Sequence, residues 1–313
     1  MRKKFIIVLV CTFITTVVVG CGGNAQLPKP TVKVTATATA TPTEKKSNVA
    51  VTGSSWELLL TGYSSDPLNN AVFHDLDNYI VVGPQGSISL STNDTVNKPL
   101  NATASLYGIA YATDSVIYVC GSQGQVLKSI NKGHTFSQAA KFGDSEPYQC
   151  QLLSFCDENN GIIASQKQMA VTNDGAKKWT KVTVPSEILS IYMLSPNEFY
   201  YVDKSLNLQK TVDAGKTWES APMNFPEKEN TLKEIRKIAL HVDNENSCTI
   251  FCYQNLGGKT KKVTSYSTTD NWDNYIVNIL PELLKCDFIS MNRAGDLASI
   301  HKDSNWFIIS KTK

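Results

Sequence analysis

Acidic side chains return at a nearly regular spacing along this chain of 313 residues. Asp174, Asp213 and Asp270 each stand two residues after a threonine, and Asn131 stands two residues after Ser129. Two carboxylates about 5–10 Å apart could act as the acid and base of a glycosidase. These residues instead return once in about 40 positions, which is the period of a structural repeat. We therefore predict that they shape turns of the fold and take no part in catalysis.

Each of these residues belongs to a short polar motif that ends in an aromatic side chain. Five copies begin at Ser91, Ser129, Thr172, Thr211 and Thr268, with spacings of 38, 43, 39 and 57 residues, and the first copy is degenerate. Short runs of β-branched and aromatic residues precede each copy, which predicts several strands per repeat. A period of this length is typical of propeller blades. The predicted turn residues are Ser129, Asn131, Gly133, Phe136, Thr172, Asp174, Trp179, Thr211, Asp213, Gly215, Trp218, Thr268, Asp270 and Tyr275.

The clearest copy, residues 211–218, reads Thr-Val-Asp-Ala-Gly-Lys-Thr-Trp and resembles the Asp-box, or BNR repeat. In that family the motif forms the hairpin between the third and fourth strands of a propeller blade. The resemblance therefore implies structural roles for its Asp, Gly and aromatic residues. Together with the glycine turns at 83–86 and 121–124, the motif also resembles the photosystem II stability and assembly factor type of propeller, and this likeness spans most of residues 56–310. A likeness between repeats implies an architecture and leaves the ligand open.

The repeats predict an all-β fold, a six-bladed β-propeller of four-stranded antiparallel sheets. Seven blades are the alternative, if the long fifth unit contains an additional blade. Residues 54–60 have the pattern of a fourth strand without a blade of its own, and the chain ends shortly after the run 306–309, where a fourth strand is missing. Pairing of these N- and C-terminal strands would close the ring and remove exposed sheet edges.

The N-terminus has the features of a secretory signal. Three positive residues, 2–4, precede the apolar run 5–19, and small residues lead to Cys21. The segment Val18-Val-Gly-Cys21 resembles a bacterial lipobox. The resemblance implies that the Cys21 thiol receives a diacylglyceryl group and becomes the first residue of the mature protein. An uncleaved membrane anchor is disfavoured, because 15 apolar residues fall short of the roughly 20 that span a bilayer.

The chain is therefore predicted to have three parts. Residues 1–21 are the signal peptide with its lipobox, residues 22–53 a Thr-, Pro- and Ala-rich tether, and residues 54–313 the propeller domain. The tether has few side chains to bury and is predicted to be disordered. We expect a lipid-anchored protein on the extracytoplasmic face of the cell membrane, where two acyl chains give firm attachment.

Charge and composition disfavour several classes of function. A net charge of +2 without a long basic run argues against nucleic-acid binding. Arg236 and Arg293 are the two arginines that follow the tether, too few for the arginine cluster with which a sialidase holds its substrate carboxylate. The four histidines are scattered and match no metal-ligand spacing, so we expect neither a metal nor another cofactor.

Six cysteines follow Cys21, an even number that is compatible with disulfides in an exported protein. Cys120 and Cys150 are expected on neighbouring blades and could meet. Cys248 and Cys252 are four residues apart on one predicted strand, which is too far for a bond. Because cysteine also serves as a small buried apolar residue, the connectivity stays open.

The extra length of the fifth unit indicates a binding surface. It is carried by the segments 222–232 and 255–262, which emerge on the same face of a four-stranded blade. Loops on a rigid scaffold commonly carry binding function. We predict a non-catalytic binding or assembly scaffold for a protein or glycan partner, with a carbohydrate-active hydrolase and a purely structural envelope component as alternatives. The possible binding-loop residues are Lys228, Lys259, Lys261 and Lys262.

Overall fold

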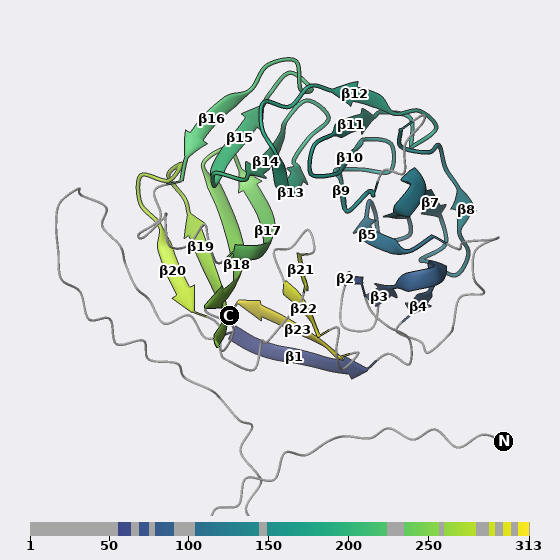
Figure 1. Ribbon diagram of the computed structural model, residues 1–313, viewed down its shortest axis with the longest axis horizontal. Coiled ribbons are helices and arrows are strands. Elements are labelled where there is room, and N and C mark those ends of the chain that lie inside the picture. Colours follow the sequence, from purple (N-terminus) through teal and green to yellow (C-terminus); the bar gives the residue numbers. More distant parts are fainter. Residues whose placement is uncertain are drawn as a thin grey trace, which may run out of the picture. The chain divides into compact units, whose positions relative to one another are not determined.

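Short strands rich in β-branched and aromatic residues form almost all of the regular structure (Figure 1). The described residues belong to one compact unit, Lys33–Lys313. The predicted signal peptide, Cys21 and the whole predicted tether lie outside the described residues, which begin at Trp56. No helix in the described ranges has the length and apolar character needed to cross a membrane. The computed structural model describes residues 56–63, 69–74, 79–90, 104–143, 149–223, 235–256, 260–279, 288–291, 297–301 and 306–312.

The strands form antiparallel sheets, most of which follow the order of the chain. The first sheet contains β2 (Asn70–Phe73), β3 (Tyr79–Val82) and β4 (Ile88–Leu90). The second contains β5 (Leu106–Tyr111), β6 (Ile117–Gly121), β7 (Val126–Ser129) and β8 (Ser137–Gln138). The third contains β9 (Leu152–Phe155), β10 (Gly161–Ala164), β11 (Met169–Thr172) and β12 (Thr180–Val182). The fourth contains β13 (Ile188–Met193), β14 (Phe199–Asp203), β15 (Asn207–Thr211) and β16 (Glu219–Pro222). The fifth contains β17 (Ile235–Asn244), β18 (Ser247–Leu256), β19 (Thr260–Thr268) and β20 (Ile276–Ile279). The last contains β21 (Phe288–Met291), β22 (Leu297–His301), β23 (Trp306–Thr312) and the N-terminal strand β1 (Trp56–Tyr63).

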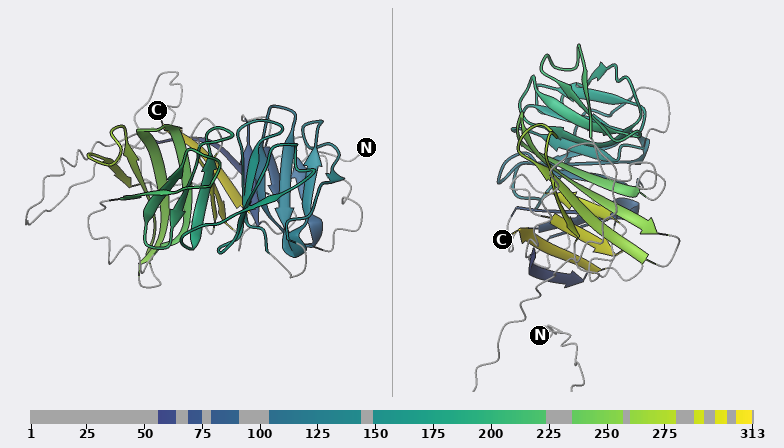
Figure 2. Two further views of the ribbon diagram at one scale, coloured as in Figure 1. Left: turned by 90° about the horizontal axis from the view of Figure 1, so that it is seen from above. Right: turned by 90° about the vertical axis from the view of Figure 1, so that its left-hand side faces the viewer.

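The sheets are arranged side by side around a central axis, with the first strand of each nearest the centre (Figure 1). These inner strands are β2, β5, β9, β13, β17 and β21, and each contacts the next one along the chain. Strand β21 contacts β2, so the sequence of contacts returns to its start. Figure 2 shows the strands running across the thickness of this unit. The described residues therefore have the architecture of a β-propeller.

The prediction of six blades with four strands in every one is wrong. Among the described residues, five sheets have four strands and the sheet β2–β3–β4 has three. The seven-bladed alternative is also wrong, because the long fifth unit forms a single sheet. Its additional residues lengthen β17 and β18 to 10 residues each and β19 to 9 residues, instead of forming further strands.

The N-terminal strand β1 pairs antiparallel with the C-terminal strand β23, from Trp56 opposite Thr312 to Tyr63 opposite Trp306. The register shifts once, between Leu58 and Leu60. This pairing gives one sheet its fourth strand. The prediction that it closes the ring is not correct as stated, because adjacent sheets meet through their inner strands. The contacts that join the last sheet to the first are those of β21 and β22 with β2.

The hydrophobic core lies between neighbouring sheets. One buried cluster joins the sheets that begin with β2 and β5, and a second joins those of β5 and β9. Two more follow the same pattern, from β9 to β13 and from β13 to β17. Face-to-face sheets pack about 10 Å apart, which suits large side chains from both. The largest fully buried side chains include Tyr118, Tyr200, Tyr201, Phe142, Phe199 and Phe251.

Polar side chains on the inner strands bond to the next sheet. The Asn70 Nδ2 atom donates to the backbone carbonyl of Tyr107 at 2.8 Å. The Ser154 hydroxyl accepts the backbone N–H of Met193 at 2.9 Å. The hydroxyl of Ser190 accepts the backbone N–H of Leu240 at 3.2 Å. Each bond replaces a hydrogen bond to water that the inner strand loses when sheets pack together.

Candidate functional site

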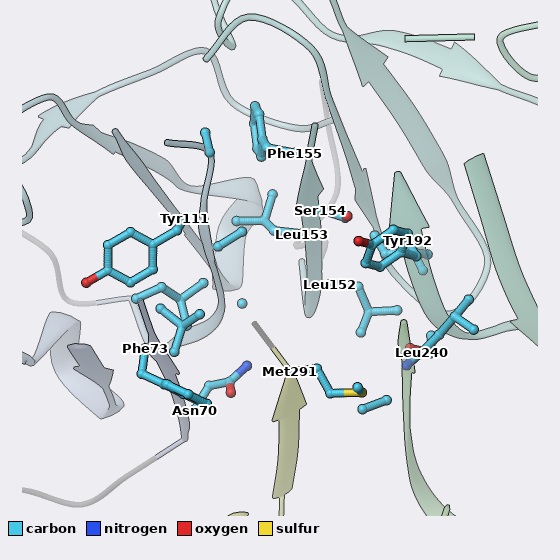
Figure 3. Close-up of a pocket in the computed structure, with 18 of the residues that line it drawn as sticks. Asn70, Phe73, Tyr111, Leu152, Leu153, Ser154, Phe155, Tyr192, Leu240 and Met291 are labelled. Atoms are coloured by element: carbon cyan, nitrogen blue, oxygen red, sulfur yellow. Dashed lines mark hydrogen bonds between the residues drawn. The ribbon is translucent and has the colours of Figure 1, made fainter. Parts of the chain in front are cut away.

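The inner strands surround a cavity of about 470 Å³ at the centre of the propeller (Figure 3). Residues of β2, β5, β9, β13 and β17 line it, together with Met291 of β21. In Figure 3, Phe73 and Tyr111 lie on one side of the space, and Tyr192 and Leu240 on the other. The volume lies within the range of about 300–1,000 Å³ that is usual for ligand pockets. The cavity is therefore the candidate functional site.

Consecutive residues of the inner strands supply most of the lining, and most of them are apolar. Strands β5 and β13 share one pattern, in which the second and fifth residues are half-buried and the others are buried. The fifth residues, Ala110 and Tyr192, both line the cavity. The lining also includes buried residues of these strands, such as Ile109 and Ile191, and it omits their half-buried second residues, Tyr107 and Leu189.

Three polar residues of the lining, Asn70, Ser154 and Ser190, hold neighbouring sheets together through the bonds described above. Their positions are therefore fixed by the fold. A hydroxyl that accepts one hydrogen bond still has a proton to donate. Ser154 and Ser190 can thus offer two donors to a ligand within a largely apolar cavity.

A histidine and an aspartate pair at one end of the cavity. The His74 Nε2 atom lies 2.7 Å from Asp114 Oδ1, and the His74 ring meets the Tyr111 ring edge-on at 5.8 Å. The two side chains are 39% and 85% exposed, so the pair lies at the rim. Asp114 is the one acid among the lining residues that the structure describes. The paired carboxylates of a glycosidase are therefore not found in this lining.

The predicted motif residues form four repeat turns, residues 129–136, 172–179, 211–218 and 268–275. Each turn joins the third strand of a sheet to the fourth. The first hydroxyl of each turn accepts the backbone N–H four residues later at 2.9–3.0 Å. It also donates to the Asn or Asp side chain two residues later at 2.8–3.0 Å. That side-chain oxygen accepts another backbone N–H at 2.9–3.1 Å.

These hydrogen bonds keep the turn carboxylates ionised. The Thr217 hydroxyl and backbone N–H both donate to Asp213 and lower its pKa to about 2. The pKa of Asp270 is lowered in the same way by the side chain and backbone of Asn274. At Asp174 desolvation is the largest single effect and raises the pKa, but the hydrogen bonds from Thr172 and two backbone N–H groups together lower it below its usual value. Groups held in this state suit a structural role better than proton transfer at neutral pH.

Two successive residues of every repeat turn have a positive φ angle. Glycine occupies the second of these positions at Gly133 and Gly215. The turn at 172–179 has Gly175 at the first position and Ala176, with a φ of 64°, at the second. The turn at 268–275 contains no glycine, and buried Trp272 has a φ of 70° there. The sequence prediction did not single out Trp272, because an aromatic residue at this position departs from the motif.

The aromatic residues that end the turns join each sheet to the preceding one. Trp179 Nε1 donates to the carbonyl of Ala140, and Trp218 Nε1 donates to the carbonyl of Thr183, both at 2.9 Å. The acceptors lie 39 and 35 residues earlier, which is about one repeat. The other two aromatic residues, Phe136 and Tyr275, pack in the clusters between their own and the preceding sheet.

The predicted binding-loop residues fall in different places. Lys228 and Lys259 lie outside the described residues. Lys261 and Lys262 are not in a loop, because they belong to β19 and stand opposite Asn255 and Gln254 of β18. The two strands extend by hydrogen bonding through most of the expected insertion, which leaves residues 257–259 between them.

Metal coordination finds no support in the described ranges, which contain no group of three or more His, Cys, Asp or Glu residues placed to hold an ion. The cavity lining itself was not found from the sequence. Its residues are mostly ordinary apolar members of inner strands, and no shared motif or spacing along the sequence could have indicated them.

A family model described as Sortilin, neurotensin receptor 3 (Sortilin-Vps10) matches residues 167–313, a little under half of the chain. A comparison with curated proteins found no match. Among solved structures, the WD40 β-propeller domain of Doa1 aligns with a TM-score of 0.53 at 15% identity, over 82% of this chain and 97% of that one. Raptor from Chaetomium thermophilum aligns with a TM-score of 0.56 at 10% identity, over 82% and 29%.

The described chain is a β-propeller. At these identities the likeness to Doa1 and Raptor is one of fold, and it confirms the propeller architecture that the repeats predicted. The chain also aligns with YCF48 bound to a D1 peptide, with a TM-score of 0.42 at 15% identity over 63% of this chain. It spans about 60% of the length of that YCF48 chain.

Proposed function

We propose that this propeller is a non-catalytic binding scaffold for a protein partner, and that the central cavity receives an apolar side chain of that partner. The observation that carries the proposal is the cavity itself, which is lined by residues of all the inner strands and is largely apolar. Burial of a leucine-sized side chain contributes about 1.5–3 kcal/mol, and the rigid inner strands need no reordering to receive it. A soluble glycan offers no comparable apolar group, which favours a protein.

The position of the rim residues favours one face of the propeller. His74 and Asp114 follow the inner strands β2 and β5, on the side where first strands connect to second strands. The docking face that the sequence predicted from the segments 222–232 and 255–262 would be on the other side, where β17 begins and β18 ends. We place the partner on the His74–Asp114 face, where the pair can bond to polar groups beside the apolar side chain.

The alternative of a carbohydrate-active hydrolase has less support. Both common glycosidase mechanisms need two carboxylates about 5–10 Å apart. The turn carboxylates point into their own turns, and the described lining contributes Asp114 alone. The Asp114→Asn variant tests this point, since a hydrolase that depends on Asp114 would lose its activity on glycan substrates.

Membrane attachment through Cys21 is part of the proposal. Its support is the sequence of the first 21 residues, with positive residues, an apolar run and small residues before the cysteine. A tether of the composition of residues 22–53 would hold the propeller away from the bilayer and leave both of its faces accessible. The extracytoplasmic location follows from the same signal.

Affinity capture with the full chain from native membranes tests the proposed cavity. The Leu152→Ser variant removes an apolar group from the half-buried part of the lining. We expect recovery of the partner to fall about tenfold or more, because at least ~1.4 kcal/mol of apolar burial is removed. The matched control is Ile130→Ser, which removes an apolar side chain that is 71% exposed on a repeat turn.

The control should bind as the unchanged chain does. Equal recovery with Leu152→Ser and Ile130→Ser would refute the cavity as the binding site. A loss confined to a Lys228→Ala/Lys259→Ala variant would instead move the partner to the face that the sequence predicted. Circular dichroism of each variant establishes that the propeller has folded.

A further inference from the structure

Two buried cysteines of neighbouring sheets meet beside the cavity. Cys120 belongs to β6, and Cys150 stands just before β9, the inner strand of the next sheet. The backbone N–H of Cys150 donates to the carbonyl of Gly121 at 3.1 Å, which brings the two backbones together. The two thiols are hydrogen-bonded to each other, and neither residue is exposed to solvent.

The packing directs the Cys120 sulfur toward the neighbouring sheet. Gly108 of β5 stands opposite Cys120, and a Cβ at this glycine would lie 2.6 Å from Cys120 Sγ and 3.1 Å from the carbonyl oxygen of Gln151. The sulfur therefore occupies space that only a glycine leaves open, next to the residue that follows Cys150. The surrounding cluster, which includes Phe142 and Phe155, is apolar and tightly packed.

We propose that Cys120 and Cys150 form a disulfide that joins the second sheet of the chain to the third when folding takes place in the presence of a disulfide oxidant. The thiolate of one cysteine attacks the oxidant, for example oxidised glutathione, and releases one reduced thiol. The second thiolate attacks the resulting mixed disulfide and releases the other. The Sγ–Sγ bond forms, both S–H bonds are broken, and the two electrons and two protons pass to two molecules of reduced glutathione.

The burial of the two thiols determines at which stage of folding the disulfide can form. Burial raises the pKa of Cys120 well above its usual value, and the neighbouring Cys150 thiol adds to this effect. The thiolate is the reactive form, so the folded dithiol reacts slowly and the bond forms while the strands are assembling. Once formed, it is out of reach of reductants in solution for the same reason.

The other described cysteines offer no comparable pair. Cys248 and Cys252 are four residues apart on β18, which separates them by about 13 Å along an extended strand. Cys156 is half-buried in a turn, with its sulfur 3.8 Å from Asp157 Oδ2 and 3.7 Å from the carbonyl oxygen of Asn160. Cys120 and Cys150 are therefore the described pair that geometry selects.

The cross-link would close a loop that contains β7 and β8, and would constrain the unfolded chain. For a loop of about 30 residues the chain-entropy argument predicts substantial stabilisation. For a domain of this size the melting temperature should fall by roughly 5–15 °C when the bond is reduced. The inference is independent of the proposed partner, because it concerns only folding in an oxidising environment.

The test uses the full chain in detergent, refolded with oxidised glutathione and analysed by peptide mapping without reduction. We expect one cross-linked peptide pair that contains Cys120 and Cys150, with a mass two hydrogens below the sum of the thiol peptides. Reduction of the denatured chain, followed by refolding without an oxidant, should lower the melting temperature of the unchanged chain. It should have the same effect on a Cys252→Ser control, which lacks a buried thiol in another sheet. The Cys120→Ala/Cys150→Ala variant should show no response to reduction.

Two results would overturn the inference. One is complete alkylation of Cys120 and Cys150 as free thiols after oxidative refolding and denaturation. The other is a cross-link that joins either residue to a different cysteine. If the double alanine variant fails to fold, the peptide map of the unchanged chain and the Cys252→Ser control decides the question by itself.

Discussion

The substitution Gly215→Ala gives a direct test of how the repeat turns join neighbouring sheets. Gly215 has a φ of 85°, and a Cβ there would lie 2.4 Å from Val182 Cγ1 and 3.2 Å from Phe199 Cζ. The left-handed backbone costs an L-residue about 1–2 kcal/mol. Overpacking against Val182 of the preceding sheet adds about 1–3 kcal/mol. We therefore expect the free energy of unfolding to fall by about 2–5 kcal/mol, a large part of the ~5–15 kcal/mol that is usual for a folded protein.

Urea unfolding of the full chain, followed by tryptophan fluorescence, measures this loss. The adjacent Ala214→Gly variant is the control, because it relieves a φ of 59° and should change stability by less than about 1 kcal/mol. A Val182→Ala substitution removes the atom that the new methyl group meets. The double variant Gly215→Ala/Val182→Ala should therefore lose clearly less than the sum of the single variants. Strict additivity would refute the steric contact between the turn and the preceding sheet.

Three further predictions follow from the turns and the N-terminus. Asp213 has a folded-state pKa of about 2, below the ~3.9 of the unfolded chain, so its contribution to stability is complete above about pH 4 and is lost as the pH falls toward 2. Asp213→Asn should flatten this part of the pH profile of the urea midpoint, and an unchanged profile would contradict the pKa assignment. Trp179→Phe keeps one aromatic ring but removes the other part of the indole and with it the Nε1 bond to Ala140. Loss of the bond by itself should cost about 1 kcal/mol in the same urea assay; no loss would show that the bond adds nothing. Cys21→Ser should abolish incorporation of a radiolabelled fatty acid and release the chain from membrane pellets, and continued labelling would exclude Cys21 as the lipidated residue.

The sequence was sufficient to predict the repeat and its turns because their chemistry is local. Within the eight residues from Thr211 to Trp218, the Thr211 hydroxyl donates to the Asp213 carboxylate, and each of these two groups accepts a backbone N–H of the same turn. Such local hydrogen bonds require particular residue types at fixed spacings, which are visible in the sequence. The same reasoning failed where the fifth unit is longer, because a long strand and a strand with a loop have similar composition. For this reason the sequence predicts a loop at Lys261 and Lys262, although they lie in β19.

The sequence by itself was sufficient to predict that the chain is built of blade-like repeats joined by turns with a hydroxyl and a carboxylate; that these carboxylates are purely structural stays a prediction. The tertiary structure decided the number of strands in each sheet and the ring-closing contact between β21 and β2. It also created the cavity, because residues such as Phe73, Tyr192 and Met291 come from different repeats and share no local motif. Contacts between distant segments depend on how whole sheets pack, and the hydrophobic effect that drives such packing has no direction and leaves no signature at any one position.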